Sequence, residues 1–183
     1  MLDEPTPGVA LRIYGAASLR RRCREVAAGE DVSALAAAML ALMERAGGVG
    51  LAAPQVGDLR RLIVVSEPDR RRSRPIVMVN PVIEERFGPA VPFEEGCLSF
   101  PDLYLTLRRP RGVVVRYRDA GGAARTLRED SLLARVIQHE VDHLDGILFI
   151  DHLTRWRRWL LAGRLLRLRA SGRMPLGARE ARA

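Results

Sequence analysis

The chain contains no lysine, so all 30 of its basic residues are arginines. It has no run of about 18 apolar residues, the minimum for a helix that crosses a membrane, so we expect no membrane span. Only two cysteines, Cys23 and Cys97, occur, which excludes a disulfide framework. A bond between them is possible, but the acidic start, Met1 to Pro5, carries no secretion or transit signal. We therefore expect a cytoplasmic protein with free thiols.

The remaining composition is that of an ordinary folded domain. Apolar residues make up 48% of the chain and charged residues 28%, values typical of globular proteins. A length of 183 residues suits one domain with a substantial core. The formal net charge of +8 favours an acidic partner such as RNA or an anionic surface, and a well-solvated basic surface explains it equally well.

Apolar periodicity divides the chain into a few helices and strands. One helix is predicted from an N-cap at Asp31 to Gly47-Gly48, and a second from Ser131 to about Asp145. A third is predicted from Thr154 to about Arg169, before a loose tail after Ser171. Strands are predicted at 62–66, 76–80, 112–117 and 123–127, with a turn at 119–122 and an exposed loop at 70–75. This pattern favours an α+β domain.

The segment from Gln138 to His143 contains an H-E-x-x-H sequence on the second predicted helix. His139 and His143 lie on one helix face, about 6 Å apart along the axis, and can hold one metal ion together. Glu140 can reach a water molecule held there. These are two of only three histidines, and they share their face with apolar residues, where an unpaired polar group would be costly. The pattern indicates metal-assisted hydrolysis rather than two surface histidines.

A catalytic metal needs a third protein ligand and an open position. A metzincin-type site would have a histidine at position 149, but that residue is Phe149. His152 misses that register by three residues, and we interpret it as a surface or structural residue. Cys97 is the better candidate, because a thiolate is a strong soft ligand and Gly96 lets the backbone approach closely. The alternative is that Cys97 is a small buried hydrophobic residue.

Residues 48–55, Gly-Val-Gly-Leu-Ala-Ala-Pro-Gln, form a third notable segment. Their small side chains leave space for a ligand against the backbone, and Gln55 offers an amide N–H that can donate to an oxyanion. Taken alone, such a segment is more often simply a turn, and it has neither a P-loop lysine nor a G-x-G-x-x-G pattern.

Together, residues 48–55, 95–99 and 138–143 resemble the three signature motifs of the peptide deformylase family, in the same order. The resemblance covers roughly residues 9 to 153 and includes Asn80-Pro81, Arg109-Pro110 and the residues on either side of the third motif. It implies a catalytic domain, residues 1–153, in which antiparallel β-sheets surround a central helix carrying the H-E-x-x-H motif. It also implies a hydrolase that removes the formyl group from the N-terminal formyl-methionine of nascent polypeptides.

The resemblance also assigns roles to residues. Cys97, His139 and His143 would bind one divalent ion, commonly Fe²⁺ in the family, with Zn²⁺, Ni²⁺ or Co²⁺ as alternatives. Glu140 would be the general base, and Gln55 and the backbone N–H of Leu98 would form the oxyanion hole. Arg109 would pair with Glu95 and brace the cysteine loop. The residues expected at the substrate, with ordinary core packing as the alternative for the apolar ones, are Val49, Gly50, Phe93, Glu95, Gly96, Leu132 and Val136.

Some positions depart from the family's usual pattern. Ser131 stands where a glycine is usual, a proline is missing before Leu19, and Leu107 stands where a valine is usual. None of these positions belongs to the expected catalytic set. The departures therefore affect only what we expect for the helix at the entry of the substrate pocket and for the rim of that pocket. We further expect Asp142 or a backbone carbonyl to orient the metal-binding histidines.

Residues 154–183 are predicted to form a basic amphipathic helix and a flexible tail. Its apolar residues alternate with arginines and are Trp156, Trp159, Leu160 and Leu166. This helix packs on the domain, binds ribosomal RNA through its phosphates, or lies on an anionic membrane. The resemblance favours the ribosome as the partner, beside the emerging substrate, with the protein as a monomer.

Other functions are weaker. A zinc peptidase that cuts internal peptide bonds would need a third ligand better than Cys97, and none stands out. A binding protein without chemistry would be expected to lack Glu140, Gln55 or a ligand, and all are present. An RNA-binding module explains the arginines but not the three motifs. A metal-dependent amide hydrolase is therefore the favoured function.

Overall fold

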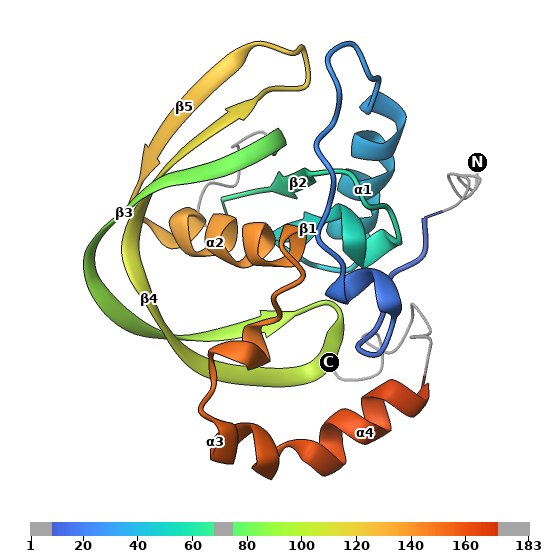
Figure 1. Cartoon of the computed structure of the whole chain (residues 1–183), viewed down its shortest axis with the longest axis vertical. Coiled ribbons are helices and arrows are strands. Elements are labelled where there is room, and N and C mark those ends of the chain that lie inside the picture. Colours follow the sequence, from blue (N-terminus) through green and yellow to red (C-terminus); the bar gives the residue numbers. More distant parts are fainter. Residues whose placement is uncertain (1–8, 68–74, 172–183) are drawn as a thin grey trace.

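Five strands form one antiparallel sheet that curves around a central helix (Figure 1). The computed structural model describes residues 9–67 and 75–171, so the predictions for residues 1–5, the loop at 70–74 and the tail after Ser171 lie outside the described residues. The strands are β1 (Gly50–Ala52), β2 (Leu62–Val65), β3 (Ile76–Cys97), β4 (Phe100–Arg118) and β5 (Ala124–Glu129). Each pairs antiparallel with the next, in the order β1-β2-β3-β4-β5.

The central helix is α2 (Leu132–Leu144), which carries the H-E-x-x-H segment. The predicted α+β fold is therefore confirmed. Ser131 begins the helix as an N-cap, because its side chain accepts a hydrogen bond of 3.1 Å from the backbone N–H of Leu133. Every residue of α2 except Leu132 is buried, so even its polar side chains lie inside the protein.

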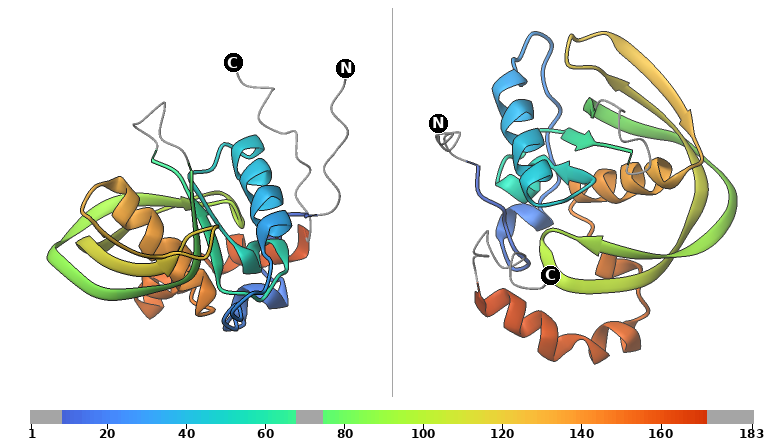
Figure 2. Two further views of the ribbon diagram at one scale, coloured as in Figure 1. Left: turned by 90° about the horizontal axis from the view of Figure 1, so that it is seen from above. Right: turned by 180° about the vertical axis from the view of Figure 1, so that it is seen from behind.

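Helix α1 (Ser33–Arg45) lies on the other side of β1 and β2 from α2 (Figure 2). Side chains alternate along β2: Ile63 and Val65 join the core beneath α2, while Leu62 and Val64 join the core beneath α1. The prediction of Asp31 as the N-cap is wrong, since that position is Val32. Asp31 still accepts a 2.8 Å hydrogen bond from the backbone N–H of Ser33.

Strands β3 and β4 are much longer than the predicted segments 76–80 and 112–117. Beyond Val79, β3 pairs only with β4, and most of its side chains from residue 82 to 94 are exposed, so the apolar alternation of a half-buried strand is missing. Its prolines, which argue against a strand, are tolerated because a ribbon edge needs fewer ladder hydrogen bonds. Register shifts between Val79 and Val82 and between Phe87 and Ala90 accommodate Pro81 and Pro89.

Short 3₁₀ helices complete the framework: η1 (Ala17–Arg20), η2 (Ala53–Val56) and η3 (Phe149–His152). A third core cluster joins η1 and η3 to the start of β4 through Leu19, Phe100 and Phe149. No helix in the described ranges is both long enough and apolar enough to span a membrane.

The predicted helix from Thr154 to Arg169 is divided into α3 (Arg155–Leu160) and α4 (Ala162–Ser171). The division falls where Leu161 and Leu165 turn toward the third core cluster, and Leu165 is buried. The four apolar residues singled out from the sequence are instead exposed, Trp156 by 64% and Trp159 by 75%. This segment therefore packs on the domain through one set of side chains and presents another set to solvent.

Candidate metal centre and active site

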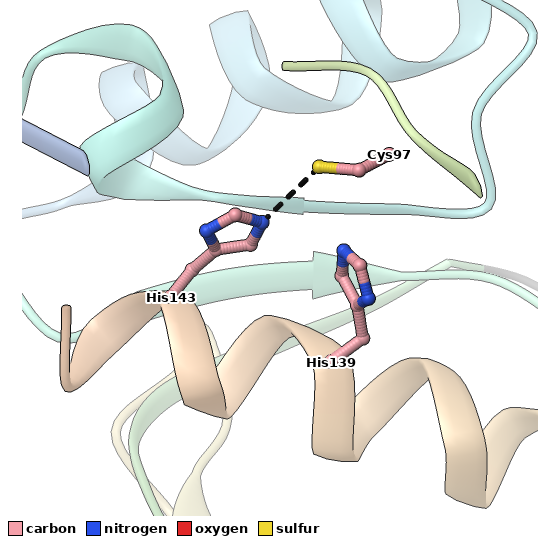
Figure 3. Close-up of side chains that lie close together, drawn as sticks. All are labelled: Cys97, His139 and His143. Atoms are coloured by element: carbon pink, nitrogen blue, oxygen red, sulfur yellow. Dashed lines mark hydrogen bonds between the residues drawn. The ribbon is translucent and has the colours of Figure 1, made fainter. Parts of the chain in front are cut away.

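One ligand atom each of Cys97, His139 and His143 lies within 4.8 Å of the other two (Figure 3). Both histidines come from α2, one helical turn apart. Cys97 is the last residue of β3, where the chain reverses into β4, and this reversal directs the thiol toward the helix. The Sγ atom of Cys97 is 3.3 Å from Nε2 of His143. Both cysteines of the chain are free, as expected.

The donor set fits a divalent transition metal. One thiolate and two imidazoles leave a fourth position open, which is the arrangement of a catalytic rather than a structural site. Burial lowers the pKa of His143 well below its ordinary value, which favours the neutral imidazole that a metal requires. In the part of the chain that the structure describes, Glu140 Oε2 and His143 Nδ1 are buried without a hydrogen-bond partner. An unpartnered carboxylate oxygen beside three ligands is an acceptor for water or substrate.

Glu140, on α2, packs closely against Gly50 of β1. Burial raises the pKa of Glu140 to about 7, so the carboxyl group titrates near neutral pH. Gly50 permits this approach, because a Cβ atom there would lie 2.7 Å from Cγ1 of Val136 and would also strike the Glu140 carboxylate. The glycine of the first motif and the glutamate of the third are thus packed against each other.

Gln55 lies in η2 with its side chain fixed at both ends. Its Oε1 atom accepts a 2.8 Å hydrogen bond from the backbone N–H of Ala52. Its Nε2 atom therefore faces the cysteine loop, 3.5 Å from Sγ of Cys97 and 3.2 Å from Oγ of Ser99. An amide held in this way presents an N–H donor beside the metal ligands.

Glu95 contacts the imidazole of His139, a role that the sequence suggested for Asp142 or a backbone carbonyl. Its Oε2 atom is 3.1 Å from Nδ1 of His139. Arg109 pairs with Glu95 through two bonds of 2.8 and 3.1 Å, so the expected pair is present. Burial alone would raise the pKa of Glu95, but hydrogen bonds from His139 and Arg109 hold it well below its ordinary value. The ionised carboxylate orients the ring and leaves Nε2 of His139 for a metal.

Two members of this network were not foreseen from the sequence. Arg135 donates a 2.7 Å hydrogen bond to Oε1 of Glu95. Arg135 lies one turn before His139 on α2, and both residues are buried. An arginine on the same helix face as His139 is the sequence feature that could have indicated this contact. His152 contacts Oδ2 of Asp142 at 2.7 Å, a contact that no sequence pattern indicated.

A cavity of about 560 Å³ opens beside the three ligands. Its lining includes Gln55, Cys97, Leu98, His139 and Glu140, and also every residue expected at the substrate: Val49, Gly50, Phe93, Glu95, Gly96, Leu132 and Val136. Phe93 is 46% exposed and therefore lies at the rim rather than in the wall. Gly96 is overlain by Tyr104, whose Cε1 would be 2.8 Å from a Cβ atom at that glycine.

Comparisons with known proteins identify the family of this chain. The family model for polypeptide deformylase matches residues 10–159. A peptide deformylase of Picosynechococcus sp. is 42% identical over 152 residues, which cover 82% of this chain and 81% of that protein. Peptide deformylase 2 of Gloeobacter violaceus is 44% identical over 149 residues, 80% of each chain.

Solved structures give the same result. The peptide deformylase of Thermus thermophilus matches with a TM-score of 0.82 at 41% identity, covering 91% of this chain and 100% of that one. A peptide deformylase of Synechococcus elongatus in complex with actinonin matches with a TM-score of 0.77 at 37% identity, covering 93% and 88%. The chain therefore belongs to the polypeptide deformylase family.

Proposed function

We propose that the chain removes the formyl group from the N-terminal formyl-methionine of nascent polypeptides, with Cys97, His139 and His143 as the ligands of one metal ion. The observation that carries this proposal is that a thiol, the imidazole of His139 and the buried, unpartnered carboxylate of Glu140 line one cavity, with the imidazole of His143 beside them. This set suits hydrolysis of an amide by an activated water molecule.

The proposed ion is Fe²⁺, with Zn²⁺, Ni²⁺ and Co²⁺ as alternatives. The ligands alone do not select it, because a mixed thiolate and imidazole site binds Zn²⁺ more tightly than Fe²⁺ and availability then decides. When bound, a divalent ion supplies Lewis acidity that favours ionisation of water near neutral pH.

Glu140 is the proposed general base. Its carboxylate takes a proton from the attacking water, whose oxygen bonds to the formyl carbon. A pKa of about 7 matches this task, because a base is most effective when its pKa lies near the working pH. As the C–N bond breaks, Glu140 returns the proton to the leaving amine, and formate and the free N-terminus are released.

Gln55 and the backbone N–H of Leu98 are the proposed donors to the formyl oxygen as it gains negative charge. The hydrogen bond from Ala52 fixes the oxygen of the Gln55 amide before substrate arrives, so the N–H side of the amide already faces the cysteine loop. One such donor typically contributes about 2.7–4 kcal/mol to the stability of the transition state.

The apolar part of the cavity is the proposed site for the methionine side chain. Val49 and Val136 line it, and Leu132 lies one turn before Val136 on α2. Phe93, at the rim, is placed to contact the rest of the peptide rather than the methionine.

Formate release from formyl-Met-Ala-Ser tests this function. Protein purified without oxygen should release formate from this peptide and should leave unformylated Met-Ala-Ser intact. A zinc peptidase would instead cut internal bonds of longer unformylated peptides. Cleavage of those peptides without formate release would overturn the proposal.

The ribosome is the proposed partner of a monomeric, cytoplasmic enzyme, because the substrate is a nascent chain. Exposed Trp156 and Trp159 stand among exposed arginines in α3, a combination that suits ribosomal RNA. Since Leu165 packs into the core, cutting the chain after Asp151, two residues before the predicted boundary between residues 153 and 154, would also damage the domain.

Paired substitutions test this partner without that damage. Replacing Arg155 and Arg157 by alanine should weaken salt-sensitive co-sedimentation with ribosomes. Replacing Arg116 and Arg128, exposed arginines on β4 and β5, removes the same charge elsewhere and should weaken it less. Equal losses in the two pairs would show that net charge, not α3, carries the binding.

A further inference from the structure

A series of hydrogen bonds leads from His152 to the candidate metal ligand His139. The Nε2 atom of His152 lies 2.7 Å from Oδ2 of Asp142. The same oxygen accepts a 2.7 Å hydrogen bond from Nη1 of Arg109. Because a guanidinium can only donate, the contact with Arg109 marks Asp142 as the acceptor, and His152 is assigned as the second donor to the same oxygen.

The second half of the series reaches the metal ligand itself. Arg109 holds Glu95 through two parallel bonds, a geometry that fixes both planes. Glu95 in turn holds Nδ1 of His139 at 3.1 Å. A change in the orientation of the Arg109 guanidinium group therefore alters the orientation of Glu95, and with it the plane of the His139 ring.

Burial makes these bonds depend on one another. The side chains of Glu95, Arg109 and Asp142 are 5%, 6% and 12% exposed, whereas that of His152 is 37% exposed. In such a low-dielectric interior, water does not replace a lost partner, and each hydrogen bond polarises the next. His152 is thus the solvent-facing end of a network that is otherwise buried.

A separate contact ties η3 to the same ligand. The ring of Phe149, at the start of η3, packs edge to face against the ring of His139 with 5.8 Å between centroids. His152, at the end of η3, is connected to His139 through the network. The short helix therefore restrains the imidazole at two points.

His152 is not needed to hold η3 in place. Asp151 does this, because its carboxylate accepts from the backbone N–H of Leu148 and from the guanidinium groups of Arg20 and Arg158. These contacts fix η3 to η1 and α3. His152 is left with the contact to Asp142.

We propose that His152 is a positioning residue for the metal site, which sets the orientation of His139 through Asp142, Arg109 and Glu95. This inference rests on the proposed metal centre but concerns a residue outside the three motifs. Without His152, Asp142 Oδ2 loses one of its two donors. The Arg109 guanidinium group can then turn toward Asp142, which weakens its two hydrogen bonds to Glu95.

Three variants test the inference: His152→Ala, His152→Gln and Asp151→Asn. His152→Ala should weaken affinity for Co²⁺ and lower kcat by about threefold to tenfold each, at the lower edge of effects seen for partners that touch a ligand directly. KM should stay unchanged, and the visible spectrum of the Co²⁺ protein should shift. His152→Gln, which restores an N–H donor to Asp142, should recover most of the loss.

Asp151→Asn is the matched control for a structural effect. It should lower Tm at least as much as His152→Ala, because it weakens the attachment of η3 to η1 and α3. It keeps the contact between His152 and Asp142, so it should change Co²⁺ affinity and spectrum less than His152→Ala does. If His152→Ala leaves affinity and spectrum at wild-type values, or if Asp151→Asn alters them equally, the positioning role is excluded.

A metal-free readout separates this inference from the proposed function. The chain has only three histidines, so their ring ¹⁵N signals are readily assigned. In metal-free protein, His152→Ala should shift or broaden the Nδ1–H signal of His139, and an unchanged signal would overturn the inference. Wild-type protein that binds no Co²⁺ would overturn the metal centre instead.

Discussion

The Nε2 atom of Gln55 lies 3.5 Å from the Sγ atom of Cys97, although 42 residues separate them in the chain. The amide is held in this orientation by the backbone N–H of Ala52, which occupies its oxygen. The first and second motifs thus meet at a donor and a metal ligand, and the direction of the donor is set by the fold.

We predict that Gln55→Glu lowers kcat by about 10²- to 10³-fold, the usual cost of losing one oxyanion donor. The glutamate keeps an acceptor for the N–H of Ala52 but has no N–H of its own. Steady-state kinetics on formyl-Met-Ala-Ser, at matched metal content, measures the effect. A kcat within twofold of wild type would remove Gln55 from the oxyanion hole.

Replacement of the general base should separate turnover from metal binding. We predict that Glu140→Ala and the isosteric Glu140→Gln keep the metal and lose about 10²- to 10⁴-fold in kcat, the range expected for general acid-base catalysis. Metal analysis of the purified variants accompanies the rate measurement. Near-normal turnover in either variant would rule out the assignment.

Gly50→Ala should reduce activity through a steric effect at the base. The added methyl group meets Val136 Cγ1 at 2.7 Å and the Glu140 carboxylate, so β1 and α2 must separate. Gly163→Ala in α4 is the matched control, because nothing lies within 4 Å of its new Cβ, and it should stabilise the protein by about 0.5–1 kcal/mol. Equal activity in the two variants, measured with thermal unfolding, would show that Gly50 is not required for this contact.

The sequence predicts those features of the fold and site that depend on local patterns, and it does not predict those that depend on long-range packing. The H-E-x-x-H helix was predicted because its spacing and its N-cap Ser131 are local signals. The length of β3 and β4 was not, because an exposed ribbon with prolines lacks apolar alternation. The role of Glu95 toward His139 and the contact of His152 depend on long-range packing, for which a single sequence carries no periodic signal.

Acid should destabilise the attachment of η3. Burial alone would raise the pKa of Asp151, but hydrogen bonds from Arg20 and the N–H of Leu148 lower it below its ordinary value of 3.8. A depressed pKa in the folded state means that the stabilisation is present above the unfolded value and is lost as pH falls below it.

The difference in unfolding free energy between wild type and Asp151→Asn isolates this effect. At pH 7 it should be on the order of 1 kcal/mol, since the pair is partly exposed. It should shrink as pH falls below about 4. Denaturant titrations of both proteins from neutral pH downward provide the measurement. A difference that stays constant or grows in acid would contradict the role of the Asp151 carboxylate.

The metal content of Cys97→Ala, compared with wild type, tests the central claim most directly. Both proteins are purified without oxygen, and the divalent metal bound per chain is quantified together with formate release. The account predicts one ion per chain in wild type and loss of both the ion and the activity in the variant, because two imidazoles alone hold a divalent ion weakly. Full metal occupancy in Cys97→Ala would contradict it.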